Sequence, residues 1–157
     1  MFYKFLAVVI LVTSVFTATA APFVVNGSEV TDSATGLIWR RCPEGMAVSS
    51  GTCTGIAGTF THEAALSQAA IQASSTGTAW RLPSVKELSS IADKSRSNPA
   101  IDSVVFPNTP ASYFWTSSPY VNGSEVVWGV NFISGHVSYG GFRYATPNYV
   151  RLVRTGQ

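Results

Sequence analysis

One pair of neighbouring residues in this sequence has the side-chain types that general acid–base chemistry needs. His62 and Glu63 could together take a proton from a bound substrate and return it. Adjacent residues of a helix point in different directions, however, and a solvated first helical turn accounts for the pair better. The other acidic residues are scattered along the chain. The pair alone therefore does not indicate an active site.

Recognisable catalytic motifs are absent from the sequence. It contains no Gly-x-Ser-x-Gly elbow, no His-Glu-x-x-His helix and no glycine-rich phosphate loop. Calcium takes about six to eight oxygen ligands, and this carboxylate-poor chain shows no acidic cluster that would supply them. We therefore expect a protein without catalytic activity, cofactor or sugar-binding calcium. A structural calcium and an enzyme of unrecognised type stay open as alternatives.

The two cysteines, Cys42 and Cys53, are separated by ten residues rich in glycine, serine and threonine. A redox motif would place two residues between them, and a zinc site would need two further ligands. In an oxidising compartment, a close and isolated pair is most simply a disulfide. We predict a structural disulfide between these two residues.

An aromatic, glycine-rich segment spans residues 140–147, between two expected strands. Aromatic rings can stack on sugar faces, and an arginine can bind a carboxylate or sulfate with two parallel hydrogen bonds. The segment fits a contact surface and an ordinary connection equally well. The four tryptophans are expected mostly in the core, and Trp115 is the one expected to neighbour this segment. The candidate ligand-binding residues are Trp115, Tyr139, Phe142, Arg143 and Tyr144.

The N-terminal end has the layout of a signal peptide. Lys4 precedes an apolar run from Phe5 to Phe16, and Ala18-Thr19-Ala20 forms a small-x-small cleavage site. The run is too short and too often interrupted by threonine and serine for a membrane span, although an uncleaved anchor is the alternative. We expect a signal peptide over residues 1–20, a single domain over residues 21–157, and export to the periplasm or the cell exterior.

Composition limits the class of partner. The 157 residues are 46% hydrophobic and 11% charged, with ten basic and eight acidic residues. A net charge of +2 is too small for electrostatic binding to nucleic acid. The 19 aromatic residues supply enough surface for a folded core, which argues against disorder. A small aromatic-rich globular domain is expected, with no membrane span after signal cleavage.

Local patterns predict an α+β domain. A first hairpin is expected over residues 30–40, followed by a polar, glycine-rich excursion over residues 41–59. Thr61 can cap a helix with an apolar stripe from Ala65 to Ala73. Ser84-Val85-Lys86-Glu87 is a capping-box pattern, and the helix it starts is expected to reach the break at residues 97–99.

The rest of the chain alternates irregular and extended patterns. Residues 100–125 are interrupted by prolines and are expected to be irregular. Strands are expected over residues 126–132, 136–139 and 148–154, with Trp128, Val130 and Phe132 on one face. The hexapeptide Val-Asn-Gly-Ser-Glu-Val occurs at 25–30 and again at 121–126. Asn-Gly favours tight turns, so two similar hairpin tips are expected rather than a duplication.

Five motifs in order resemble one known family. They are Thr35-Gly36-Leu37-Ile38-Trp39, Trp80-Arg81-Leu82-Pro83-Ser84-Val85-Lys86-Glu87-Leu88, Phe114-Trp115-Thr116-Ser117-Ser118, the set Trp128, Phe132 and Gly135, and Tyr149-Val150-Arg151-Leu152-Val153-Arg154. This ordered set resembles the Lcl C-terminal domain family of exported bacterial proteins, over about residues 30–155. Leu152 stands where many members carry a cysteine, so a disulfide through that strand is absent here.

The resemblance implies a C-type-lectin-like fold, with two helices packed on a small, mainly antiparallel sheet and many loops. Some members are adhesins that bind host glycans. The resemblance therefore implies an exported binding domain that recognises a carbohydrate or a surface protein. A structural or assembly module of the bacterial envelope is the alternative. The sequence does not indicate the oligomeric state.

Overall fold

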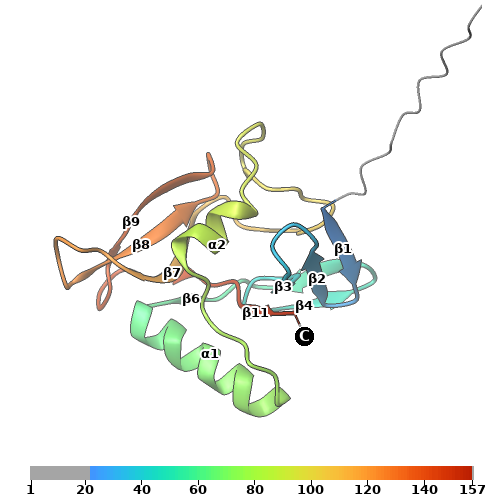
Figure 1. Cartoon of the computed structure of the whole chain (residues 1–157), viewed down its shortest axis with the longest axis horizontal. Helices are drawn as coiled ribbons and strands as arrows, with labels where there is room; N and C mark the ends of the chain where they lie inside the picture. The colour runs from blue at the N-terminus through green and yellow to red at the C-terminus, as the bar shows by residue number, and fades with distance from the viewer. Residues whose placement is uncertain (1–21, 157) are drawn as a thin grey trace, which may run out of the picture.

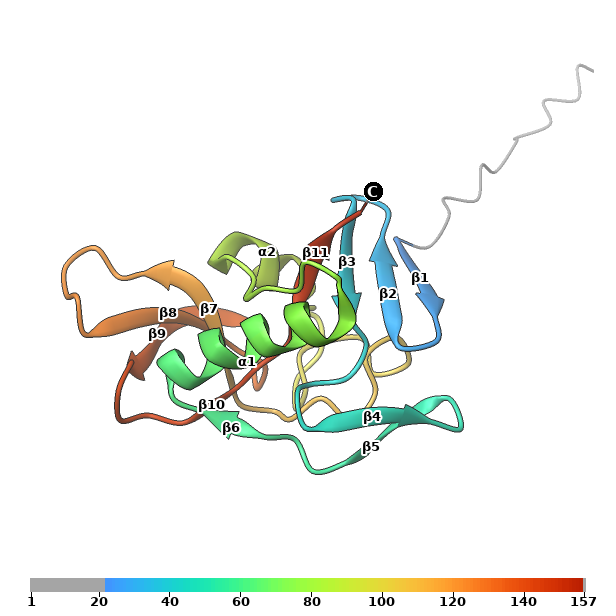
Figure 2. The same ribbon diagram turned by 90° about the horizontal axis from the view of Figure 1, so that it is seen from below.

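The computed structural model describes residues 22–156 and has an α+β fold with mainly antiparallel sheets (Figures 1 and 2). A four-stranded sheet contains the strands in the order β1 (Phe23–Asn26), β2 (Glu29–Asp32), β3 (Leu37–Arg40) and β11 (Val153–Thr155). The two ends of the described chain therefore meet in one sheet. The expected signal peptide, residues 1–20, lies outside the described residues.

A second, five-stranded sheet forms the other end of the molecule (Figure 1). Its order is β6 (Thr59–Phe60), β10 (Asn148–Tyr149), β7 (Tyr113–Pro119), β8 (Val126–Asn131) and β9 (His136–Phe142). Strands β10 and β7 run parallel, and the other neighbours in this sheet are antiparallel. The longest strands, β7 to β9, form a meander with β9 at the edge.

The two helices cover opposite faces of the five-stranded sheet. Phe114 and Trp115 are neighbours in β7, and because successive side chains of a strand alternate, they enter different core clusters. Phe114 packs with Leu88 of α2 (Val85–Ser90), and Trp115 packs with Ala65 of α1 (His62–Thr76). Both faces of β7 are therefore buried.

The N-terminal ends of both helices confirm the sequence prediction. The Thr61 side chain accepts a hydrogen bond from the Ala64 backbone N–H, and Gly77 ends α1 in the left-handed conformation. Ser84 and Glu87 form the expected capping box at α2. The apolar stripe of α1 is narrower than expected, since Ala65 and Ala69 are buried whereas Leu66 is 41% exposed.

The prediction that the second helix reaches residues 97–99 was wrong, because α2 ends at Ser90. The Ser89 and Ser90 hydroxyls donate to the backbone carbonyls of Lys86 and Glu87, which gives the last turn local partners that compete with a longer helix. Ile91, just beyond the helix, is buried as the sequence pattern predicted.

Two strand predictions need correction. Residues 113–119 were expected to be irregular but form β7, which lies between Pro110 and the chain reversal after Pro119. The expected closing strand over residues 148–154 is divided into β10 and β11, which belong to different sheets. The residues between them, 150–152, pass from one sheet to the other and are fully buried.

The expected polar excursion over residues 41–59 contains a hairpin of its own. Strand β4 (Met46–Ser49) pairs with β5 (Thr52–Gly55), and the tip residues Ser50 and Gly51 both have positive φ. The predicted disulfide is present, with the Cys42 and Cys53 sulfurs 2.05 Å apart. It joins β5 to the chain just before β4.

Both copies of the repeated hexapeptide lie at hairpin tips, as predicted. The first connects β1 to β2, and the second connects β7 to β8. Within residues 22–156, no helix is long and apolar enough to cross a membrane.

Candidate functional site

Three aromatic side chains form a cluster on the β7–β9 meander. The Tyr120 ring lies 5.2 Å from the Trp128 ring and 6.3 Å from the Tyr139 ring, centroid to centroid. Trp128 and Tyr139 are directly opposite each other in the β8–β9 pair. Within the cluster, Tyr139 is 62% exposed, whereas Trp128 is half-buried. The rings are therefore held by the sheet but open to solvent on one side.

Phe142 extends this exposed aromatic region toward the end of β9. In the β8–β9 pair, Tyr139 is opposite Trp128 and Phe142 is opposite Val126. Val126 lies two residues before Trp128 in β8, but Phe142 lies three residues after Tyr139 in β9. The register therefore shifts by one residue in β9, near Gly141, whose φ of +113° is strained for other residue types. The bulge keeps Phe142, which is 63% exposed, on the same side of the strand pair as Tyr139.

Arg143 and Tyr144 lie just past the end of β9. The Arg143 guanidinium carbon is 5.3 Å from the centre of the Tyr144 ring, a cation–π arrangement. Arg143 also donates from Nη1 to the Ser124 carbonyl, and its backbone N–H donates to the Glu125 carbonyl. Tyr144 is 53% exposed. We call Tyr120, Trp128, Tyr139, Phe142, Arg143 and Tyr144 the aromatic surface.

Four of the five candidate residues from the sequence belong to the aromatic surface, and Trp115 does not. The Trp115 side chain is fully buried, and its indole N–H donates to the Phe60 carbonyl at 2.7 Å. A tryptophan with all of its ring area and its one donor used in the core presents nothing to a ligand. The expectation that Trp115 neighbours a ligand is corrected accordingly.

His62, the first residue of α1, lies in the core and not in a solvated turn. Its ring contacts Trp115 edge-to-face at 5.4 Å, and Nε2 lies 3.0 Å from the Thr116 carbonyl. Because a carbonyl only accepts, Nε2 carries the proton, and the buried Nδ1 has no hydrogen-bond partner among the described residues. Burial lowers the pKa of His62 below its ordinary value, and the Arg143 charge adds to the effect. Glu63, its sequence neighbour, is exposed.

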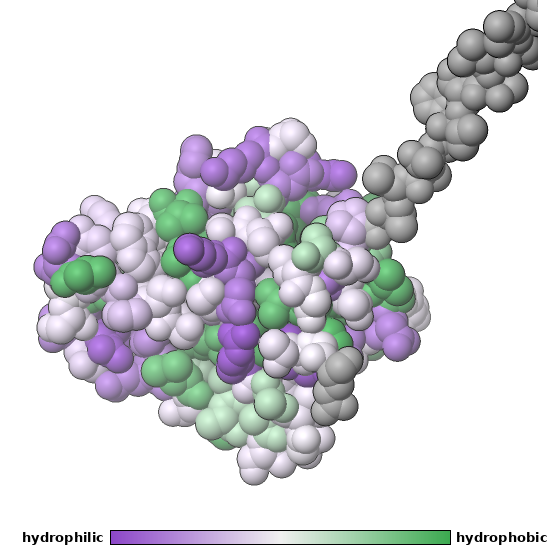
Figure 3. Space-filling view, in the orientation of Figure 1, coloured by the Kyte–Doolittle hydropathy of each residue, from purple (hydrophilic) through white to green (hydrophobic). Residues whose placement is uncertain are grey.

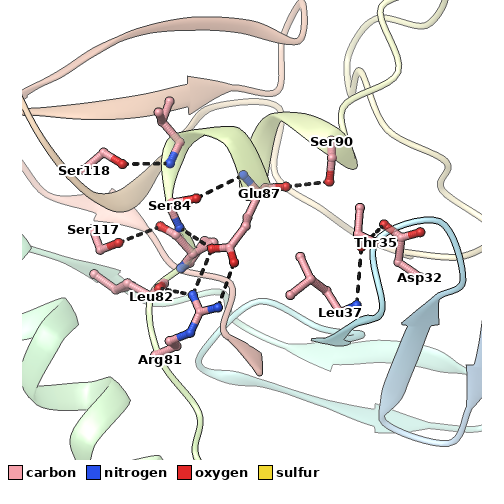
Figure 4. A network of polar contacts seen from close by, with 12 residues as sticks. Asp32, Thr35, Leu37, Arg81, Leu82, Ser84, Glu87, Ser90, Ser117 and Ser118 are labelled. Atoms are coloured by element: carbon pink, nitrogen blue, oxygen red, sulfur yellow. Dashed lines mark hydrogen bonds and ion pairs between the residues drawn. The ribbon is translucent and has the colours of Figure 1, made fainter. Parts of the chain in front are cut away.

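The motif around Arg81 and Glu87, which carries much of the family resemblance, forms a structural network at the start of α2 (Figure 4). The Arg81 guanidinium binds the Glu87 carboxylate through two hydrogen bonds, of 2.9 and 2.7 Å. Glu87 also accepts from the Ser84 backbone N–H. The hydrogen bond from Arg81 lowers the pKa of Glu87 to about 2. Ser118 of β7 accepts from the Val85 N–H, which ties the helix to the sheet.

Arg151 is fully buried and serves the core. Its guanidinium donates to the Arg40 and Arg41 carbonyls and to Thr109 Oγ1, and it lies 4.9 Å from the Phe106 ring centre. Burial lowers its pKa to about 9, so it keeps its charge at neutral pH. Arg81 thus has a carboxylate partner, and Arg151 has backbone partners.

Within residues 22–156, no three histidine, cysteine, aspartate or glutamate side chains are close enough together to hold a metal ion. Three residues with a shifted pKa have structural roles: Arg81 and Glu87 join α2 to the loop before it, and Arg151 anchors the crossing between the sheets. The aromatic surface, in contrast, is exposed and available for contact with a partner.

Tyr120 and Trp128 are members of the aromatic surface that the sequence did not single out as contact residues. Trp128 was placed on a core face by alternation with Val130 and Phe132. The available signal was the pairing of residues 126–132 with residues 136–139, which predicts Trp128 opposite an aromatic residue. Tyr120 reaches the cluster through the β7–β8 turn, whose geometry the sequence does not specify.

This α+β domain, with a disulfide and an exposed aromatic surface, matches a known family of domains. The model of the Lcl C-terminal domain matches residues 28–154, which is most of the chain. The chain therefore belongs to the Lcl C-terminal domain family, as its motifs indicated. Comparisons with curated proteins and with solved structures gave no match.

Proposed function

We propose that this chain is an exported, non-catalytic binding domain that recognises a carbohydrate or a surface partner through the aromatic surface. The observation that carries the proposal is the exposure of Tyr139, Phe142 and Tyr144, each more than half open to solvent on one short stretch of chain. In a domain whose other described aromatic side chains are buried or half-buried, this exposure costs hydrophobic free energy unless a partner covers the rings.

The chemistry of the aromatic surface fits a ligand with both apolar and polar faces. Tyrosine and tryptophan combine a flat apolar ring with a hydrogen-bonding group, which suits the C–H faces and hydroxyls of a sugar. In the orientation of Figure 1, the visible surface of the domain is a mosaic of pale and purple residues with separate green patches, and not one continuous apolar surface (Figure 3). Arg143 adds a cation beside the Tyr144 ring that can bind a sulfate or carboxylate.

The fold supports this proposal by analogy. The family is similar to C-type-lectin-like domains, in which long loops on an α+β core bind ligands. The pairing of β3 with the last strand, β11, and the long connection between α2 and β7 are compatible with that fold. Because fold alone does not fix function, the aromatic surface carries the argument. The Cys42–Cys53 disulfide suits an oxidising compartment and supports export.

A role in envelope assembly is the alternative, and one observation favours it. Among the described residues, strand β1 lies at an edge of the four-stranded sheet, with Val24 56% and Val25 41% exposed. An exposed apolar edge strand can pair with a strand of another protein.

A glycan array probed with residues 21–157 tests the proposal. We expect binding to at least one class of neutral, acidic or sulfated glycan at micromolar protein. If no glycan binds, the carbohydrate form of the proposal fails. Cross-linking in envelope extracts then separates the remaining forms: a partner attached at the aromatic surface supports surface-protein recognition, and one attached at β1 supports envelope assembly.

A further inference from the structure

A groove of about 530 Å³ lies at the end of the molecule opposite the aromatic surface. It lies beside the disulfide, between one side of α1, the end of β3 and strand β4. Figures 1 and 2 both show β4 and β5 on the side away from β8 and β9. Its volume falls within the usual range for sites that bind small molecules.

Four polar side chains line this groove as two hydrogen-bonded pairs. Gln68 donates from Nε2 to the Glu44 carboxylate at 2.9 Å, and Arg40 donates from Nη2 to the Gln72 amide oxygen at 3.1 Å. Gln68 and Gln72 are about one turn apart on α1, so they stand side by side along the groove, about 6 Å apart along the helix axis. The four groups thus form a row of fixed polar atoms.

The protein itself orients the two charged members of the row. Glu44 is only 7% exposed, and its backbone bonds to Val150 and Gly58 hold the chain at this point. The Arg40 guanidinium carbon lies over the Trp80 ring, 4.5 Å from its centre. A site whose polar groups are already oriented loses little entropy when a ligand binds.

The hydrogen-bonding atoms left over are acceptors at the Glu44–Gln68 pair and donors at the Gln72–Arg40 pair. Each pair uses one oxygen or one N–H group of each partner, which leaves a Glu44 oxygen and the Gln68 amide oxygen as acceptors. The Gln72 amide N–H groups and further Arg40 N–H groups are left as donors. None of these atoms has a partner of its own among the hydrogen bonds of residues 22–156. A hydroxyl group both donates and accepts hydrogen bonds, so it can pair with either the acceptor atoms or the donor atoms of the groove.

The two opposite charges in the groove favour a neutral ligand. Arg40 and Glu44 carry opposite unit charges in the same groove, so a neutral ligand leaves the site balanced. A simple anion would face Glu44, and a simple cation would face Arg40, each at a cost in a partly desolvated site. Met46 and Val48 of β4 form an apolar wall against which C–H groups can pack.

From this geometry we propose that the groove between α1 and β4 is a second binding site, for a neutral polyhydroxylated ligand the size of one or two sugar rings. Neighbouring ring hydroxyls would contact the Glu44–Gln68 pair and the Gln72–Arg40 pair, and the ring C–H groups would pack on Met46. The site is separate from the aromatic surface and stands whether or not that surface binds.

The test uses ¹⁵N-labelled residues 21–157 and a panel of neutral sugars at millimolar concentration: glucose, galactose, mannose, N-acetylglucosamine and their common disaccharides. Glycine and sodium sulfate serve as zwitterionic and anionic probes. We expect at least one sugar to shift the backbone amide resonances of residues 44–48 and 68–72 in a saturable way. The Gln68→Ala/Gln72→Ala variant is expected to weaken that binding at least tenfold. Ser67→Ala, on the exposed side of the same helix, is the matched control.

Each result decides the proposal. Saturable shifts that are lost in the double variant and kept in S67A support it, provided that the double variant keeps the wild-type amide spectrum elsewhere. If the double variant fails to fold, Gln72→Glu replaces it, since that change removes the amide donors and is expected to weaken sugar binding by the same factor. The proposal is overturned if no sugar shifts residues 44–48, if only glycine or sulfate does so, or if the variants bind as the wild type does.

Discussion

The backbone N–H of His62 donates to the Arg143 carbonyl at 2.9 Å, so the first residue of α1 holds the chain segment that presents Phe142 and Tyr144. The imidazole of the same residue is buried against Trp115 and bound to the Thr116 carbonyl. The residue whose backbone holds this segment thus carries a buried, titratable side chain. Protonation of that side chain is expected to make the stability of the domain dependent on pH.

The stability of the domain is expected to fall as the pH falls below about 6.5. The folded-state pKa of His62 is lowered, whereas the unfolded chain protonates its histidines near 6.5. The unfolded state therefore binds more protons in this range, and the contribution of His62 is present above 6.5 and lost as the pH falls toward its folded-state pKa. Urea unfolding at pH 7.5, 6.5 and 5.5 measures the effect.

Two variants test whether His62 causes this pH dependence. His62→Gln can keep a hydrogen bond to Thr116 but does not titrate, so its unfolding free energy should change less over this range than that of the wild type. His136→Gln, at an exposed position, should behave like the wild type. Equal slopes for all three proteins would show that another group is responsible.

Glu87 is expected to make the stability of the domain depend on pH in a second, more acidic range. Its pKa of about 2 in the folded state is below the ordinary value near 4.5, so its stabilisation is complete above about 4.5 and is lost as the pH falls toward 2. Glu87→Gln removes the ion pair and weakens the capping box. We expect a loss of about 1–2 kcal/mol at pH 7, an amount kept small because the Arg81 side chain is 43% exposed.

Glu63→Gln provides the matched control for Glu87. Glu63 is also in the first turn of a helix, but it is exposed. Denaturant unfolding should show no more than about 0.5 kcal/mol of change for this variant. If E87Q costs no more than E63Q, the network of Figure 4 does not stabilise the fold.

Local signals in the sequence specified the starts of both helices and the disulfide. Thr61 and Ser84 act on backbone groups two or three residues away, and Cys42 had a single partner in the whole chain. These interactions are short-range or unique, so they can be inferred without knowing the fold. The end of α2 could not be inferred, because local serine hydrogen bonds replaced the helix before its proline break.

The candidate site depended on long-range pairing that the sequence specifies weakly. The exposure of Tyr139 and Phe142 follows from the position of β9 at the edge of the sheet, which depends on the strand order. Trp115 and Trp128 both lie on interior strands, but α1 packs against the Trp115 side chain, so Trp115 is fully buried whereas Trp128 is half-buried. The division of residues 148–154 between two sheets likewise has no local signal.

The disulfide is expected to contribute about 2–3 kcal/mol to stability, because it closes a short loop in the unfolded chain. The Cys42→Ser/Cys53→Ser variant should melt about 10 °C below the oxidised wild type. Calorimetry of both proteins, with and without reductant, provides the measurement. Reductant should lower the wild-type midpoint toward that of the variant and leave the variant unchanged. Two free thiols in exported protein would contradict the assignment.

Arg151→Lys is expected to destabilise the domain by about 3–5 kcal/mol. A lysine ammonium cannot reproduce the planar set of hydrogen bonds to Arg40, Arg41 and Thr109, and the remaining buried charge would lack partners. Arg96→Lys, at an exposed position, is the control and should change stability by less than about 0.5 kcal/mol. Chemical denaturation of the wild type and both variants measures these changes in unfolding free energy.

The central claim is that the aromatic surface binds the partner, and Arg143→Ala/Tyr144→Ala tests it most directly. The measurement compares wild type, this double variant and Ile56→Ala on one glycan array, with melting temperatures recorded in parallel. Ile56 is 88% exposed and follows β5, at the far end of the molecule. The account predicts glycan binding by the wild type and I56A, at least a tenfold loss in the double variant, and melting temperatures within about 2 °C of one another. Undiminished binding by the double variant, or a loss accompanied by a fall of several degrees in its melting temperature, would contradict it.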